Sequence, residues 1–360
     1  MQGSIGELTS IKTGKLDANA SVANGRYPFF TCSKETLTID SYSYDCECVL
    51  VAGNGDLNVK YYNGKFDAYQ RTYIIEDASD GKLYMKYLYW FMSSYINELR
   101  KQAIGGVIKY IKLGNLTGAK IQLPSIKKQM EIVNIITKVN NVLCYRESQL
   151  HKLDELIQAR FVEMFGDPIT NSFGWEEHWL DEYIEFLTSG SRGWAKYFTD
   201  VGNELFITIK NVKNNQITID NIQYINAPNS KEAKRTRVKT GDLLISITAD
   251  LGRTGVVDEA ISKRGAYINQ HLSLVRLDQS RINPLYVSYF LETEGGKKQF
   301  ESKNQNGVKA GLNFEAIRSL KILVPPMELQ EKYLTFVNQV NKSKLVIKNL
   351  LQIYKHQIQM

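Results

Sequence analysis

The chain has 360 residues, of which 43% are hydrophobic and 23% charged, and a formal net charge of +7. This length allows two domains of ordinary size, each with its own core. No run reaches the roughly 18 apolar residues that a membrane-spanning helix needs, and the N-terminus lacks the basic and apolar regions of a secretory signal. We therefore expect a cytoplasmic protein with no membrane partner.

Charge and cysteine content bear on partners and on redox chemistry. Residues 1–165 carry 20 Lys and Arg against 17 Asp and Glu, and residues 166–360 carry 25 against 21. Neither half is a basic tail, so a nucleic-acid surface has to come from clustering in the fold. The four cysteines are Cys32, Cys46, Cys48 and Cys144. Their spacing supplies no second pair for a zinc site, so we expect ordinary thiols and no metal.

An internal repeat organises the chain. Residues 123–129 (Leu-Pro-Ser-Ile-Lys-Lys-Gln) match residues 324–330 (Val-Pro-Pro-Met-Glu-Leu-Gln) at an offset of 201. The same offset pairs Gly106-Val107 with Gly307-Val308, Leu116 with Ile317, Ile121 with Ile322, Val139-Asn140 with Val340-Asn341, and Tyr89 with Phe290. At an offset of 200, Gln70 pairs with Gln270. The matches keep their order over about 70 residues, which indicates an ancient duplication.

The first copy begins with short β-type runs, such as residues 48–52, that are broken by Gly, Asn and Asp. An aromatic-rich helix is predicted over residues 83–91. A strand that ends at Pro124 then leads into a long helix from about Ser125 to Phe165, which Gly166-Asp167-Pro168 terminates.

The second copy opens near Trp175 and repeats this order. Residues 243–247 are a predicted strand after Gly241-Asp242, and residues 284–291 are a predicted helix. A second long helix is predicted from about Met327 to the C-terminus. Nothing before Met1 corresponds to residues 172–180, so the first copy is expected to lack its opening strand, through trimming or a late start codon.

Both long helices carry a narrow seam with alternating steps of four and three. In the first helix the series is Ile132, Ile136, Val139, Leu143, Arg146, Leu150, Leu153 and Ile157. In the second it is Leu329, Tyr333, Phe336, Val340, Ser343, Ile347, Leu350 and Tyr354. Such a seam is typical of a coiled coil, and 40 residues of helix extend about 60 Å. We expect the two helices to pair with each other.

These features resemble the specificity subunit of type I restriction–modification systems. The resemblance rests on the plan of globular part and helix, repeated once, on the Leu-Pro and Val-Pro-Pro junctions, and on residues 160–168. Residues 53–71, from Gly-Asn-Gly through Lys-Tyr-Tyr-Asn-Gly-Lys-Phe to Tyr-Gln-Arg, resemble one common type of target-recognition domain. The resemblance covers essentially the whole chain.

The resemblance implies an α/β (α+β) fold with two target-recognition domains and two long antiparallel coiled-coil helices. The domains would be residues 1–124 and 167–325, and the spacer helices residues 125–166 and 326–360. Each domain would read one half of a split site on double-stranded DNA. The helices would dock two methyltransferase subunits, which motor-nuclease subunits would join.

Catalytic motifs give little support to an enzyme. The only Pro-Pro pair, in Val324-Pro325-Pro326-Met327, lacks the polar and aromatic neighbours of an amino-methyltransferase loop, and no phosphate-binding glycine loop follows a strand. Asp278 with Glu301-Ser302-Lys303 fits a metal-nuclease spacing, but such matches are frequent at this charge content. The four histidines are scattered. We expect no catalysis and no cofactor.

Base reading requires Arg, Lys, Asn and Gln on loops, with basic and hydroxyl groups for the phosphates. In the first copy the candidates are Lys12, Thr13, Lys15, Asn54, Lys60, Tyr61, Tyr62, Gln70 and Arg71. In the second copy they are Ser191, Arg192, Arg253, Lys263, Arg264, Gln270, His271 and Lys309. Gln70-Arg71 and Gln270-His271 occupy the same repeat position.

Other interpretations stay open at this point. Gln70 and Gln270 equally fit a structural role in which each side chain bonds its own sheet backbone. The basic residues between 231 and 239 fit a solvated loop as well as a phosphate-binding stripe. The seams fit the dimerisation coils of an unrelated two-domain enzyme, and the whole chain fits a non-catalytic adaptor whose two globular parts bind other proteins.

Overall fold

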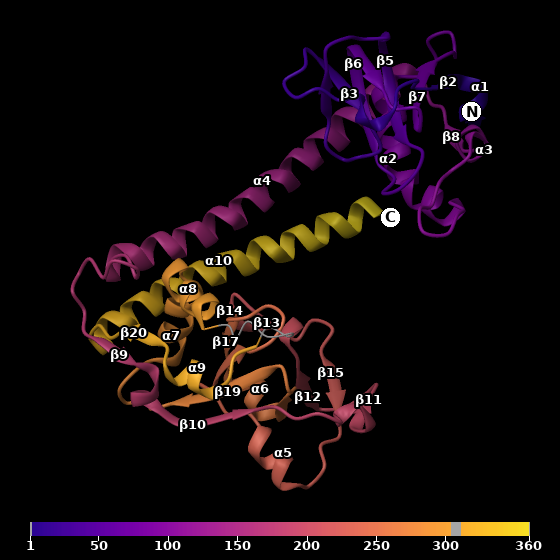
Figure 1. Ribbon diagram of the computed structural model, residues 1–360. Helices are drawn as coiled ribbons and strands as arrows, with labels where there is room; N and C mark the ends of the chain where they lie inside the picture. Colours follow the sequence, from indigo (N-terminus) through magenta and orange to yellow (C-terminus); the bar gives the residue numbers. More distant parts are fainter. Residues whose placement is uncertain (1, 304–310, 360) are drawn as a thin grey trace. The chain divides into compact units, whose positions relative to one another are not determined.

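The computed structural model describes residues 2–303 and 311–359. The chain forms two compact units, Met1–Tyr145 and Arg146–Met360, each with its own core. Helices and strands are both present in each unit, which confirms the mixed α/β fold (Figure 1). None of the helices in the described part is both long and apolar enough to cross a lipid bilayer.

The first unit is built around a six-stranded sheet with the order β2-β7-β5-β6-β3-β4. Its strands are β1 (Gln2–Ser4), β2 (Thr9–Thr13), β3 (Tyr27–Phe30), β4 (Leu37–Ile39), β5 (Tyr44–Ala52), β6 (Val59–Ala68), β7 (Thr72–Asp77) and β8 (Lys120–Gln122). Its helices are α1 (Ile5–Leu8), the 3₁₀ helix Ala18–Ala20, α2 (Met85–Gln102), α3 (Leu113–Thr117) and the start of α4 (Ile126–Phe165).

Side-chain periodicity explains how α2 packs against this sheet. Met85, Leu88, Met92 and Leu99 are buried at spacings of three, four and seven, which places them on one helical face. They pack in one cluster with alternate residues of β5, Val49 among them. Residues that face the other side of the sheet form a second, smaller cluster.

The second unit contains a six-stranded sheet, β10-β19-β16-β17-β14-β13, and a four-stranded sheet, β11-β15-β12-β18. Its strands are β9 (Glu177–Trp179), β10 (Ile184–Ser189), β11 (Phe198–Thr199), β12 (Glu204–Ile207), β13 (Val212–Lys213), β14 (Asn215–Ile217), β15 (Gln223–Ile225), β16 (Leu243–Ser246), β17 (Thr254–Val256), β18 (Ala266–Ile268), β19 (Leu272–Leu277) and β20 (Lys321–Leu323). Its α-helices are α5 (Lys231–Thr236), α6 (Glu259–Arg264), α7 (Pro284–Leu291), α8 (Glu294–Ser302), α9 (Phe314–Arg318) and α10 (Met327–Gln359). Its 3₁₀ helices are Leu180–Tyr183, Trp194–Tyr197 and Ile209–Asn211.

The opening strand of the first copy is present. β1 pairs antiparallel with β8, with Gly3 opposite Ile121, and β9 pairs in the same way with β20, with His178 opposite Ile322. The expectation that the first copy lacks this strand is therefore wrong. A three-residue strand is defined by backbone pairing, and the side chains of the two strands have nothing in common that a sequence comparison could detect.

The repeated glutamine after each proline junction has a clear role. Gln129 is fully buried; its Oε1 accepts from the Tyr84 amide at 2.8 Å, and its Nε2 donates to Lys82 O and Pro124 O. Gln330, also fully buried, accepts from the Asn283 amide at 3.0 Å and donates to Pro325 O. In each copy one side chain thus ties the start of the long helix to the start of α2 or α7.

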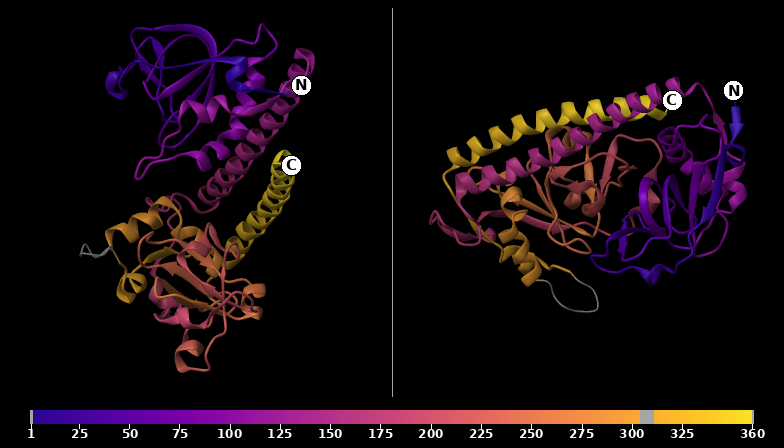
Figure 2. Two further views of the ribbon diagram at one scale, coloured as in Figure 1. Left: turned by 90° about the vertical axis from the view of Figure 1, so that its right-hand side faces the viewer. Right: turned by 90° about the horizontal axis from the view of Figure 1, so that it is seen from above.

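Within the second unit, the C-terminal part of α4 runs antiparallel to α10, and Figure 2 shows this part of α4 beside the start of α10. The Tyr333 hydroxyl donates to Ile157 O, and the Tyr333 ring lies 5.4 Å from that of Phe161. Further along α10, Lys344 forms an ion pair with Asp154, which lies earlier on α4. Later residues of α10 therefore contact earlier residues of α4, as expected for antiparallel helices.

The seam on α10 differs from the predicted series. Besides Gln330 and Leu334 near its start, the buried residues of α10 form the series Tyr333, Val337, Val340, Lys344, Ile347 and Leu351. The rhythm of four and three is confirmed, but the prediction of Ser343, Leu350 and Tyr354 in the seam is wrong, because these residues are exposed. Lys344 occupies a seam position because its ammonium group reaches Asp154, whereas hydropathy alone places a lysine outside.

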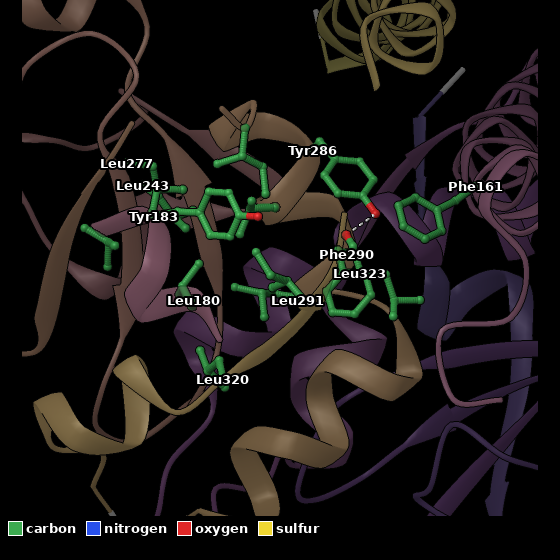
Figure 3. Packing of buried hydrophobic residues seen from close by; sticks show 14 of the residues in the cluster. Phe161, Leu180, Tyr183, Leu243, Leu277, Tyr286, Phe290, Leu291, Leu320 and Leu323 are labelled. Atoms are coloured by element: carbon green, nitrogen blue, oxygen red, sulfur yellow. Dashed lines mark hydrogen bonds between the residues drawn. The ribbon is translucent and has the colours of Figure 1, made fainter. Parts of the chain in front are cut away.

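The core of the second unit joins the long helices to the globular part. Figure 3 shows Phe161 of α4 facing Tyr286 of α7, whose hydroxyl donates to Leu323 O at 2.9 Å. The Phe161 and Tyr286 rings are stacked, with centroids 5.9 Å apart. Since Tyr286 is fully buried, this bond satisfies its one polar group.

Candidate nucleic-acid interface

A close backbone crossing positions the β6–β7 turn in the first unit. The Gly14 amide donates to Thr72 O at 3.1 Å, and a Cβ added at Gly14 would lie 2.1 Å from Ala68 O. Only glycine fits this crossing. The turn itself is closed by the Thr72 amide, which donates to Tyr69 O at 2.8 Å. Gln70 and Arg71 are consequently held, exposed, in the turn at the ends of the interior strands β6 and β7.

Two further segments meet the same turn. The Gly53 amide donates to Arg71 O at 2.8 Å, and the Ile111 amide donates to Gly53 O at 2.9 Å. Asn54 forms a backbone bridge with Tyr110. A cavity of about 330 Å³ opens here, lined by Thr13, Gly53, Gln70, Arg71, Tyr73 and Ile111. The structure therefore brings four predicted residues, Thr13, Asn54, Gln70 and Arg71, to one place.

The second unit repeats the backbone crossing of this site. The Gly190 amide donates to Leu272 O at 3.1 Å, and a Cβ at Gly190 would lie 2.1 Å from Asn269 O. The turn is closed by the Leu272 amide, which donates to Asn269 O at 3.1 Å. Gly190 and Leu272 thus correspond to Gly14 and Thr72.

The two further segments are repeated as well. The Ile247 amide donates to His271 O, the Leu312 amide donates to Ile247 O, both at 3.0 Å, and Thr248 bridges Gly311. Gln270-His271 therefore lies where Gln70-Arg71 lies in the first unit. The predicted shared position of the two pairs is confirmed at the level of backbone hydrogen bonds.

The side chains at the shared position make different contacts. Gln70 Nε2 donates to the Asp17 carboxylate at 2.8 Å. In the second unit Gln270 Nε2 lies 3.1 Å from His271 Nε2, and His271 Nδ1 lies 2.7 Å from Thr248 Oγ1. These bonds join side chains to one another, whereas the structural interpretation of the two glutamines predicts bonds to the sheet backbone.

Three predicted residues of β6 are engaged within the first unit. Lys60 Nζ donates to Ser33 O at 2.5 Å, and its burial lowers its pKa. The Tyr61 hydroxyl donates to Glu47 at 2.7 Å. The Tyr62 ring packs in the cluster on the far side of the sheet. The contacts of these side chains are with the sheet and its neighbours, and the structure does not place them in the cavity at the turn.

The remaining predicted cations differ in how firmly they are held. Lys15 is exposed beside the crossing, and Lys12 is paired with Glu76 across β2 and β7. In the second unit Lys263 pairs with Glu259 at 2.7 Å. Arg253 forms an ion pair with Asp250 at 2.5 Å, and Arg264 donates to the Asn203 carbonyl at 3.2 Å. These surface pairs are weak and can exchange for phosphate.

Ser191 and Arg192 lie directly after the Gly190 crossing. Ser191 bridges Asn269 through its backbone, and its Oγ accepts from Arg235 at 3.0 Å, while Arg192 is exposed. Arg235 of α5 also donates to Ser189 O at 2.8 Å. Arg235 is one of the basic residues between 231 and 239, and it bonds residues on both sides of Gly190. The predicted residue Lys309 lies outside the described residues.

Sequence reasoning missed Thr248 and Tyr110 as members of this site, and it left Arg235 open between a solvated loop and a phosphate-binding stripe. Thr248 corresponds to Asn54, but their separation is 194 residues, because loops of different length intervene between the two copies. A search at fixed offsets of 200 and 201 does not find it. A signal was nevertheless present, since Thr248 directly follows the strand that was predicted over residues 243–247.

The sparse catalytic candidates are accounted for by local contacts. Asp278 Oδ1 accepts from the amide and hydroxyl of Ser280, and these bonds lower the pKa of Asp278. His178 contacts Glu182 and Glu176. No group of three or more potential metal ligands occurs among residues 2–303 and 311–359.

The geometry defines a protein with two homologous units, each of which presents a polar loop cluster on the same backbone frame. Residues 1–153 and 174–353 match the type I restriction modification DNA specificity domain. The chain therefore belongs to this family.

Curated relatives agree with this assignment. The type I restriction enzyme EcoDI specificity subunit of Escherichia coli is 40% identical over 154 residues, which are 43% of this chain and 33% of that subunit. The EcoBI specificity subunit of Escherichia coli is 16% identical over 321 residues, or 82% of this chain and 66% of that subunit. The aligned segments thus span about one third and just under two thirds of these relatives.

Two solved structures share the fold. The S subunit of a type I restriction–modification system from M. genitalium superposes with a TM-score of 0.61 at 16% identity, covering 100% of this chain and 93% of that one. A chain from a structure that concerns complex assembly and conformational transition of the type I R-M system gives a TM-score of 0.59 at 16% identity, covering 100% and 95%.

Proposed function

We propose that this chain recognises a bipartite site on duplex DNA as the specificity subunit of a type I restriction–modification complex. One observation carries the proposal: the same backbone frame presents Gln70-Arg71 in one unit and Gln270-His271 in the other. Glutamine pairs with adenine, and arginine with guanine, through two hydrogen bonds in the major groove. Two such clusters fit two half-sites.

The neighbouring groups fit the phosphates that flank each half-site. Lys12, Thr13 and Lys15 lie beside the first turn, and Ser191 and Arg192 lie beside the second. Three other cations of the second unit have surface contacts: Arg253 and Lys263 form ion pairs, and Arg264 donates to Asn203 O and lies over the Tyr224 ring. Lysine and arginine at such positions orient a duplex without reading its sequence.

The proposal also assigns a role to each segment of the chain. Residues 1–124 and 167–325 form the recognition domains, and residues 125–166 and 326–360 form the spacer helices. Two methyltransferase subunits dock on these helices, and motor-nuclease subunits join the complex in the cytoplasm. Exposed apolar residues on the helices support a docking role, among them Tyr145 of α4, which is 76% exposed.

This assignment makes the chain a non-catalytic subunit that needs no cofactor of its own. The purified chain should neither methylate nor cleave DNA. Together with its methyltransferase partner, it should direct methylation to two short motifs that are separated by a fixed gap. Methylome sequencing of a host strain that expresses both proteins tests this, and methyl transfer by the isolated chain would contradict it.

Salt dependence separates DNA reading from the adaptor hypothesis. If each unit contacts several phosphates, the logarithm of the affinity for duplex DNA falls linearly with the logarithm of salt concentration, by about 0.9 per phosphate neutralised. An assembled complex whose duplex affinity ignores salt, or which binds no duplex, would instead support an adaptor that binds other proteins.

The long helix α4 acts in this proposal as a spacer. Four residues inserted at Val142, which is exposed, lengthen the helix by about 6 Å. This equals about two base-pair steps of roughly 3.4 Å. The insertion precedes the residues of α4 that contact α10 in the second unit, Asp154 with Lys344 and Ile157 with Tyr333. Both half-motifs should therefore stay unchanged while the gap between them grows. A change in the bases that are read would refute the spacer role.

A further inference from the structure

A short loop beside the first recognition cluster exposes two adjacent aliphatic side chains. Residues 104–110 form this loop, which is closed by two backbone bonds between Ile104 and Tyr110, at 3.0 and 2.8 Å. At its tip Val107 is fully exposed and Ile108 is 63% exposed. We call these two residues the apolar tip.

The loop is held firmly and is not a loose excursion of the chain. Gly105 has a φ of +118°, and a Cβ added there would lie 2.6 Å from Ile108 O, so the loop closes tightly on itself. The Gly55 amide donates to Lys109 O at 2.9 Å. The apolar tip therefore projects from a backbone that is fixed to the segment carrying Asn54.

Single exposed apolar residues are ordinary on protein surfaces, but two β-branched ones at the tip of a fixed loop leave apolar surface facing water. The charged residues in this segment indicate what kind of partner contacts the tip. Lys109 and Lys112 are exposed within the same segment, and Arg71 is exposed on the turn that contacts Gly53. Exposed cations in the same segment as an apolar tip, and on the turn bonded to it through Gly53, fit a duplex, which offers phosphates outside and apolar base surface within its grooves.

We infer that Val107 and Ile108 contact the apolar surface of a base in the half-site that Gln70 and Arg71 read. This inference rests on the proposed function and adds to it an apolar element of recognition. The base surface is either a thymine methyl group or the face of a base that the tip unstacks. The repeat pairs Gly106-Val107 with Gly307-Val308, so the sequence of the second copy carries an aliphatic residue at the corresponding position.

The test uses the full chain in complex with its methyltransferase partner and a duplex with the half-sites found by methylome sequencing. The double variant Val107→Ser with Ile108→Ser should bind this duplex about tenfold more weakly. Its affinity for a duplex whose first half-site is scrambled should equal that of the unaltered complex. Because both side chains are exposed, the melting temperature should not change. The salt slope should also stay the same, since no phosphate contact is removed.

The matched control is Val201→Ser, which removes a valine that is 85% exposed in the second unit. This variant should bind the duplex as the unaltered complex does. An equal loss of affinity in the control would mean that any exposed valine has this effect and would overturn the inference.

Two modified duplexes distinguish the sources of apolar base surface. Deoxyuridine in place of thymine removes the methyl group and should weaken binding of the unaltered complex, but not of the double variant, if the tip contacts that methyl. A 2-aminopurine base should fluoresce more strongly with the unaltered complex than with the double variant, if the tip unstacks it. Either response supports the inference.

The outcomes also separate this inference from the proposed function. A complex that shows no salt-dependent duplex binding refutes the proposed function itself. A complex that binds DNA normally, with the double variant indistinguishable on every duplex, refutes only the role of the tip. Reduced assembly of the double variant with the methyltransferase, seen by size-exclusion chromatography, would mean that the tip docks the protein partner and would likewise overturn the inference.

Discussion

The paired turn residues provide the sharpest test of half-site reading. The double variant Gln70→Ala with Arg71→Ala should relax the first half-motif and leave the second intact, and Gln270→Ala should do the reverse. A side chain that makes two hydrogen bonds with a base contributes about 1–3 kcal/mol of discrimination, a factor of about 5 to 150. Because the two sites lie in separate units, the losses should be nearly additive in the combined variant.

The structure predicts only a small loss of folding stability in the first double variant. Gln70 loses one exposed bond to Asp17, and the backbone bonds that fix the turn do not involve either side chain. We expect a loss of at most about 1 kcal/mol. If these residues instead serve the fold, the melting temperature of the variant should fall while its methylated motif stays the same.

Methylome sequencing beside a thermal melt distinguishes the two outcomes. A suitable control is Lys101→Ala on α2, which removes an exposed cation paired with Glu98 and should change neither readout. Unchanged motifs in both turn variants would remove these residues from the site. A change in the first half-motif by Gln270→Ala would refute the assignment of one half-site to each unit.

Three further predictions concern stability. Gln129→Ala leaves the Tyr84 amide and two carbonyls unpartnered, so it should lower the free energy of unfolding of the first unit by about 1–3 kcal/mol. Gln330→Ala should lower that of the second unit in the same way. Urea titrations followed by hydrogen exchange assign each loss to its unit. Asp154→Asn should destabilise the second unit because it leaves the Lys344 ammonium without its counter-charge, whereas Lys344→Met should be neutral or stabilising; equal losses in both variants in urea would contradict this. The bond to Glu182 raises the pKa of His178. This contact therefore stabilises the fold fully below about pH 6.5, and the stabilisation is lost as the pH rises through the raised pKa. His178→Gln should lower the melting temperature near pH 6 and leave it unchanged near pH 9.

The sequence was sufficient to predict the features that depend on hydrophobic periodicity and on repeated motifs. Both long helices, the duplication and the mixed fold belong to this group. The seam on α10 shows where periodicity becomes insufficient. Steps of four and three are compatible with more than one register when polar residues stand near the boundary. In the register that the structure shows, Lys344 is buried and pairs with Asp154. That contact joins residues 190 positions apart and leaves no local sequence signal.

The correspondence between the two copies of the candidate site was predictable only where the repeat preserves its residues. Gln70 and Gln270 could be aligned because both copies keep a glutamine there. Thr248 could not be aligned with Asn54, because loop lengths differ between the copies. Lys60 and Tyr61 fit the composition of a DNA-reading loop, but in the structure they bond Ser33 and Glu47, since sequence does not reveal which way a strand residue faces.

The two copies share one backbone frame at the turn although the second turn residue is Arg71 in one and His271 in the other, and the hydrogen bonds explain how this is achieved. Every bond that the copies share at the turn joins backbone to backbone, so it places no demand on the side chains at positions 70, 71, 270 and 271. The side-chain requirement falls instead on Gly14 and Gly190, where a Cβ would lie 2.1 Å from a carbonyl oxygen. A recognition domain built in this way can exchange Arg71 for a histidine at the equivalent point without altering its fold. Under the proposed function, specificity and stability are thereby carried by different atoms, so each half-site could change while the other half and the long helices remain as they are.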